Sequence, residues 1–200
     1  MRYFPGRGVR KRSSTIAFIW KCLLLFSIVL LMTPGMLARD FLTDQEIRLM
    51  QNVQSIDKRT GVYMDAAALR LQTVGDRFEG KASGPGDALE FYSQEEMLED
   101  YYKILEHVMI VVGEAFDEPR RRENINIKKA LQHLKSEMSR NLDRLTTLKR
   151  RAEERKKEEL WNRVNSAIDI SDGVRDGADE GLSRIARREA EEAKDPRRSR

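Results

Sequence analysis

Two histidines, His107 and His133, are the only ones in the 200-residue chain, and a metal or acid–base site would depend on them. Di-iron carboxylate bundles carry Glu-x-x-His pairs on one helical face. Ile104 and Ala130 stand where that motif needs glutamate, and His133 with Glu137 makes at most half of a site. The sequence therefore predicts no catalytic, cofactor or metal residue. The alternative left open is a helical-bundle metal-binding protein or enzyme that uses His107 and His133 with nearby carboxylates.

The stretch 169–180 has the outline of a calcium loop without its chemistry. Acids occupy the first and twelfth positions, but Val174 stands where the sharp turn needs glycine and Gly173 stands where a ligand belongs. An acid–glycine pair recurs every four residues, which on a helix would align Gly173, Gly177 and Gly181 in one stripe. Two interpretations stay open, namely close approach of another helix and a flexible joint.

The single cysteine, Cys22, lies in an apolar segment and not in the body of the protein. A basic run at 7–12 precedes the apolar residues 22–32, and a break at Pro34-Gly35 followed by Ala38 comes after them. This order is typical of a secretory signal peptide. The exported body is then free of cysteine, so helix packing has to stabilise it.

Whether this N-terminal segment is cleaved stays open. If Lys21 is tolerated, the apolar segment extends over 16–37, which is long enough for a membrane anchor. A signal peptide and an uncleaved anchor both leave the basic end in the cytoplasm and send the body across the membrane. The predicted location is the periplasm or the outer face of the inner membrane.

The charge distribution argues against nucleic acid as a partner. The chain has 37 Lys and Arg and 33 Asp and Glu. Six of the bases and none of the acids precede Arg39, which leaves 31 bases against 33 acids in the body. The basic character belongs to the N-terminal segment, so the electrostatic attraction to phosphate that a basic domain would have is missing.

Apolar residues recur at alternating spacings of three and four along the body, which is typical of amphipathic helices. A first helix is expected over 43–79, opened by a capping box of Thr43 and Glu46 and closed by Gly80. A second helix is expected from near Ser93, where Glu96 three residues on again completes a capping box, to just before Pro119.

Residues 108–112 of the second helix are apolar all round, which predicts a central, buried helix, although such a β-branched run also suits a strand. A third helix begins near Ile125 and presents its apolar face up to Leu148. These three helices are enough to close a bundle.

Residues 149–159 (KRRAEERKKEE) are nearly all charged and suit a solvated helical face or connector, in which Glu153 and Lys157 can pair. Apolar spacing resumes over 160–185, which predicts a fourth helix. Two questions stay open, namely whether this helix is continuous with the third and whether it folds back or projects as a coiled-coil arm. The last residues, 188–200, lack large apolar side chains and are expected to be disordered.

Several short segments resemble those of uncharacterised exported helical proteins of acidobacteria. They are residues 42–47 (LTDQEI), 54–60 (QSIDKRT) leading to 69–71 (LRL), 98–102 (LEDYY) and 114–117 (EAFD). The resemblance covers roughly 42–182. It implies an exported helical protein and no particular activity.

The predicted fold is all-α, an antiparallel bundle of three to four helices with a long charged, coiled-coil-like C-terminal helix, preceded by an apolar signal or anchor helix. The predicted parts are 1–38 (signal peptide or anchor), 39–148 (bundle), 149–187 (charged connector and C-terminal helix) and 188–200 (tail). The predicted function is a non-enzymatic interaction or structural module of the cell envelope. Its expected partners are the membrane through 16–37 if uncleaved, and a protein or a second copy through the amphipathic helices.

Overall fold

The structure, a computed structural model, describes residues 40–117 and 124–194. These residues form five helices and no strand, which confirms the predicted all-α class. The helices are α2 (Asp44–Asn52), α3 (Ile56–Phe78), α4 (Gln94–Asp117), α5 (Asn124–Glu154) and α6 (Glu158–Lys194). The apolar segment 16–37 lies outside the described residues, and none of the five helices is long and apolar enough to span a bilayer.

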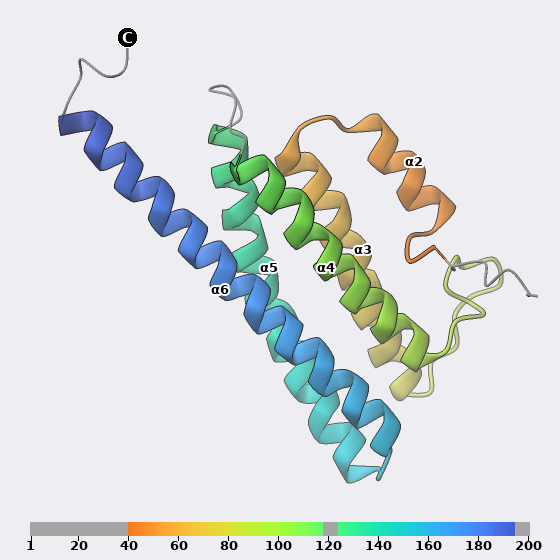
Figure 1. Ribbon diagram of the computed structural model, residues 1–200. Helices are drawn as coiled ribbons and strands as arrows, with labels where there is room; N and C mark the ends of the chain where they lie inside the picture. The colour runs from red at the N-terminus through yellow and green to blue at the C-terminus, as the bar shows by residue number, and fades with distance from the viewer. Residues whose placement is uncertain (1–39, 118–123, 195–200) are drawn as a thin grey trace, which may run out of the picture. The chain divides into compact units, whose positions relative to one another are not determined.

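Helices α3 to α6 pack as a four-helix bundle. In Figure 1, α3 and α5 run in one direction while α4 and α6 run in the other. Helix α3 packs against α4 and α5, and α6 packs against the same two helices from the other side. Consecutive helices α4 and α5 are thus diagonal neighbours, with little contact between them.

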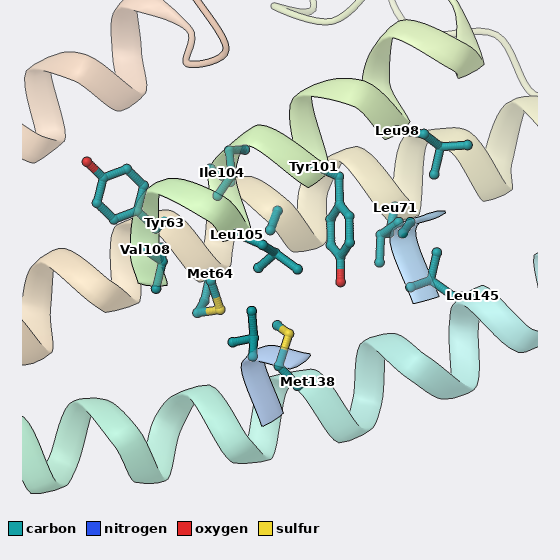
Figure 2. Packing of buried hydrophobic residues seen from close by; sticks show 14 of the residues in the cluster. Tyr63, Met64, Leu71, Leu98, Tyr101, Ile104, Leu105, Val108, Met138 and Leu145 are labelled. Atoms are coloured by element: carbon teal, nitrogen blue, oxygen red, sulfur yellow. The ribbon is translucent and has the colours of Figure 1, made fainter. Parts of the chain in front are cut away.

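The core forms where the apolar faces of the four long helices meet. Figure 2 shows Met64 and Leu71 of α3, Leu105 of α4 and Met138 and Leu145 of α5 converging on the same space. All five side chains are buried. Met64 and Leu71 are seven residues apart, as are Met138 and Leu145, and a spacing of seven residues places two side chains on the same face of a helix.

The prediction of one helix over 43–79 is wrong in one respect, because this segment forms the two helices α2 and α3. Val53 has an extended backbone (φ −113°, ψ 129°), and α3 begins only after Ser55, which is also extended. The break lets α2 turn against α3, where Arg70 bonds to Glu46. Apolar residues keep their helical spacing through Val53 and Ile56, so the sequence pattern did not indicate the break. Leu49, an apolar residue of α2, is 49% exposed.

The capping boxes were predicted correctly. In α2 the hydroxyl of Thr43 accepts from the backbone N–H of Glu46, whose carboxylate accepts from the N–H of Thr43. At the start of α4, Ser93 and Glu96 exchange the same two bonds, at 3.0 and 2.7 Å. Each box satisfies two backbone donors that a helix start leaves free.

The charged run 149–159 contains the turn between α5 and α6. Lys156 has a positive φ of 54°, which ends α5, and α6 folds back along it. Helix α6 is therefore not continuous with α5 and does not project as an arm, so these two alternatives are wrong. The predicted pairing of Glu153 with Lys157 does not occur among the described contacts, since Lys157 lies past the helix end with its ammonium 5.4 Å from the ring centre of Phe78. At its other end α6 continues to Lys194, beyond Arg187 where the disordered tail was expected to begin.

Candidate functional site

Two hollows lie one after the other along the seam between α4 and α6. The first, of about 210 Å³, has mostly apolar walls that include Met109, Val112 and Phe116 of α4 and Leu131 of α5. The second, of about 420 Å³, is more polar. We call their combined surface the α4–α6 groove. It is bordered on α4 by Tyr102, Glu106, Met109 and Gly113, and on α6 by Ser166, Gly177, Glu180 and Arg184.

The glycine stripe of α6 lies in a continuous helix and forms part of the groove wall. A Cβ at Gly177 would lie 3.1 Å from Met109 Cε, and one at Gly181 would lie 2.9 Å from Leu131 Cδ1. Close approach is thus the correct interpretation at these two positions. It does not extend to Gly173, where a Cβ would meet nothing within 4 Å. Gly113, across the groove on α4, also faces open space.

The expectation that residues 108–112 are buried all round is wrong. Val108 and Val112 are buried, but Met109 is 39% exposed and Ile110 is 53% exposed. The reason is that α4 has neighbours only toward α3, α6 and the bundle interior, which leaves its outer face uncovered. Tyr102, two turns earlier on α4, is exposed as well. The groove therefore has an apolar border on α4 that no described part of the chain covers.

The two histidines lie on different helices and have different neighbours. His107 packs between aromatic rings, with its ring centre 5.6 Å from that of Phe41 and 5.4 Å from that of Tyr63. His133 is half-buried on α5, and its expected companion Glu137 forms an ion pair with Arg140 at 2.8 Å. Within residues 40–117 and 124–194, no group of three or more His, Cys, Asp or Glu side chains is placed to hold a metal ion.

A polar layer that the sequence did not reveal crosses the centre of the bundle. Tyr101 of α4 donates its hydroxyl to Ser171 Oγ of α6 at 2.7 Å, because Ser171 gives its own proton to the carbonyl of Ala167 at 2.6 Å. Burial raises the pKa of Tyr101 to about 12, against the opposing effect of its hydrogen bond to Ser171 and of the nearby amide of Asn141. The phenol is therefore a stable neutral donor.

Asn141 of α5 completes this layer and is fully buried. It lies close enough to oppose the rise in the pKa of Tyr101, yet its amide atoms make no hydrogen bond of normal geometry with the described residues. A signal was present in the sequence, because Asn141 interrupts the apolar stripe between Met138 and Leu145. A buried polar residue at such a position can fix the register of neighbouring helices.

A buried ion pair joins α2 to α3. Both guanidinium Nη atoms of Arg70 contact the carboxylate of Glu46, and they also donate to the carbonyls of Ala66 at 3.0 Å and Phe41 at 2.8 Å. Arg70 is 1% exposed. The carboxylate of Glu46 balances the charge of Arg70 within the protein. This buried pair is therefore suited to holding α2 in place and is not open to a ligand.

The turn between α5 and α6 also contacts the end of α3. Arg155 donates to the carbonyl of Phe78 at 2.6 Å, and its guanidinium carbon lies 4.4 Å from the centre of the Phe78 ring. Arg151 bonds to Glu79 at 2.9 Å. The charged run is thus partly an interhelical contact and not solely a solvated connector.

Comparisons with protein-family models, with curated proteins and with solved structures found no match. The resemblance to exported helical proteins of acidobacteria stays a prediction. The α4–α6 groove is the candidate site, because it alone among the features above combines a hollow with exposed apolar side chains.

Proposed function

We propose that this chain is an exported, non-enzymatic helical protein of the cell envelope that binds a partner through the α4–α6 groove. The observation that carries the proposal is the apolar border of the groove, where Met109 and Ile110 are exposed beside a hollow of about 210 Å³. Exposed apolar side chains that adjoin a concave surface are characteristic of interaction sites.

The N-terminal order of charges and apolar residues supports the location. The basic run before the apolar segment 16–37 is the arrangement that directs export, and it applies to a signal peptide and to an anchor alike. In this proposal the body acts in the periplasm or at the outer face of the inner membrane. If the segment is retained, it also tethers the protein to the membrane.

Site-specific photocrosslinking in intact cells tests both parts. A benzophenone amino acid replaces Ile110, which is exposed next to the groove residue Met109, or, as the control, Ser139, which is exposed on α5. We expect a crosslinked adduct from position 110 and not from position 139, recovered with the envelope after fractionation. Recovery of the protein in the cytosol would overturn the export proposal. Equal adducts at both positions, or none at either, would contradict binding through the groove.

A further inference from the structure

We infer that the α4–α6 groove binds an amphipathic helix whose apolar face is flanked by lysine or arginine side chains. This inference rests on the proposed function and specifies the partner of the same site.

The dimensions of the groove suit a helix of a few turns. Tyr102 and Gly113 are the first and last α4 residues of the border defined above, and at 1.5 Å per residue they lie about 17 Å apart along the helix axis. This is about three turns. A helix that docks in a groove uses apolar side chains at positions i, i+3 or i+4, and i+7, which fit within that length.

The apolar hollow gives such a helix a place for one anchoring side chain. Its volume of about 210 Å³ exceeds the roughly 150 Å³ of an apolar cavity that holds benzene, so a leucine or phenylalanine side chain fits. Gly113 and Gly177 on opposite walls contribute no side chain that would fill the space. Met109, at the rim, is unbranched and can adapt to the incoming group.

The charges along the borders select the partner. Exposed carboxylates line the groove at Glu106 on α4 and Glu180 on α6. Three more, Glu114 on α4 and Asp169 and Asp176 on α6, are exposed within one helical turn of the residues that border it. Of these five, only Asp176 forms an ion pair within the described residues, with its sequence neighbour Arg175 at 3.4 Å.

The bases at the two ends of the groove are already engaged. At one end Arg163 faces Glu99 at 3.6 Å, and Lys103 bonds to Glu99 at 2.7 Å. At the other end Arg184 and Arg188 both lie over the ring of Phe116, with their guanidinium carbons 4.6 and 5.3 Å from the ring centre. The middle of the groove therefore presents a negative border to a partner.

This charge pattern argues against two other occupants. In a symmetric dimer, a second copy would bring the same five carboxylates against those of the first, since both partners use one surface. An anionic lipid surface would be repelled for the same reason. A helix with basic flanks gains favourable pairs on both borders while its apolar face covers Met109 and Ile110.

The test uses two 18-residue helical peptides with the same leucine face, one flanked by lysines and the other by glutamates. Binding to the full-length protein in zwitterionic nanodiscs is measured by fluorescence anisotropy, with empty nanodiscs as background. We expect the lysine peptide to bind about tenfold more tightly than the glutamate peptide, and the difference to shrink at high salt.

Variants assign the effect to the groove. The double variant Glu106→Lys/Glu180→Lys should weaken binding of the lysine peptide about tenfold. Its matched control, Asp65→Lys/Asp143→Lys, changes the net charge equally at exposed positions on α3 and α5 and should leave binding unchanged. Gly113→Leu should fill the hollow and abolish binding of the peptide. Circular dichroism verifies that each variant is folded.

The outcomes separate this inference from the proposed function. Equal affinity for both peptides, or an unchanged affinity in the double variant, overturns the basic-flank inference. Binding of neither peptide, with crosslinking from position 110 intact, overturns the inference and leaves the proposed function standing. A dimer that Gly113→Leu dissociates shows that a second copy occupies the groove and also overturns the inference.

Discussion

At the residue scale, burial governs the acid–base behaviour of Tyr101. Its hydroxyl lies among apolar side chains at the bundle centre (Figure 2), where a phenolate would lose its hydration. Burial accordingly raises the pKa of Tyr101 to about 12, although its polar neighbours Ser171 and Asn141 act in the opposite direction. The folded state therefore retains this proton at a pH at which the unfolded chain, with an ordinary tyrosine pKa of about 10, releases it.

The first prediction is that alkaline pH destabilises the protein through Tyr101. The contribution of the neutral phenol is complete below about pH 10 and is lost as the pH rises toward the folded pKa of about 12. Over that window the free energy of unfolding should fall by roughly 1.4 kcal/mol per pH unit for this group. Urea unfolding between pH 8 and 11.5 measures the slope. Tyr101→Phe should reduce it, although Tyr63, whose pKa burial also raises, keeps part of it.

The exposed Tyr102 supplies the control for this prediction. Tyr102→Phe should leave the alkaline slope as in the unmodified protein. If Tyr101→Phe and Tyr102→Phe have the same slope, the stability loss does not come from the buried phenol.

The second prediction concerns the buried pair of Glu46 and Arg70. Glu46→Ala should lower the free energy of unfolding by about 3 kcal/mol, since it leaves the guanidinium of Arg70 buried without its counter-charge. Thr43→Ala, which removes the capping hydroxyl and keeps the pair, should cost about 1 kcal/mol. Chemical denaturation of both variants gives the comparison. Equal costs would mean that Glu46 acts only as a cap.

At the scale of the elements, two helices end in the same way with different residues. After α3, Gly80 N–H bonds to Arg77 O at 3.0 Å and Lys81 N–H bonds to Asp76 O at 2.9 Å. After α5, Lys156 and Lys157 form the equivalent bonds to Glu153 and Ala152, at 3.0 and 2.9 Å. This is the Schellman arrangement, which requires a left-handed residue just past the helix.

The third prediction follows from the residue in that left-handed position. The φ angle is 82° at Gly80 and 54° at Lys156. Because a side chain is disfavoured there, Lys156→Gly should stabilise the protein by about 0.5 to 1 kcal/mol, and Gly80→Ala should destabilise it by about 1 kcal/mol. Thermal unfolding compares the two variants. A loss of stability in Lys156→Gly would show that contacts of the lysine outweigh its backbone strain.

The helix boundaries show how far local patterns extend. Capping boxes and Gly80 act within one or two turns, so the starts of α2 and α4 and the end of α3 could be predicted from neighbouring residues. The break at Val53 could not, because the contact that accompanies it joins Glu46 to Arg70, 24 residues apart. The fold-back of α6 likewise depends on contacts across the α5–α6 turn, such as that between Lys149 and Asn165 at 2.6 Å.

At the scale of the whole molecule, the arrangement of the four long helices creates the groove. Helix α4 contacts α6 along one side and leaves its outer face uncovered, which turns the apolar run 108–112 from an expected core segment into a border. Figure 1 shows α4 and α6 running in the same direction on that side of the bundle. A partner helix bound in the groove would pack against α4 and α6, which already lie side by side.

The fourth prediction addresses the metal-binding or enzymatic alternative. The ring of His107 packs between Phe41 and Tyr63, and Glu137 near His133 is paired with Arg140. Elemental analysis of the purified full-length protein is therefore expected to find no metal in stoichiometric amount. A His107→Phe variant should remain folded, because phenylalanine keeps an aromatic ring in that position. Stoichiometric metal that His107→Phe removes would favour the alternative and count against a non-enzymatic module.

The sequence by itself determined the helical class, the capped starts of α2 and α4 and the residues that end α3, because these depend on contacts within a few residues. It also indicated the glycine stripe, whose close approach now involves Gly177 and Gly181 but not Gly173. Only the tertiary structure decided that Met109 and Ile110 are exposed, that Tyr101 meets Ser171 and that α2 turns back on α3. The physical reason is that burial and long-range pairing depend on which helices become neighbours, and the spacing within one helix does not specify its neighbours.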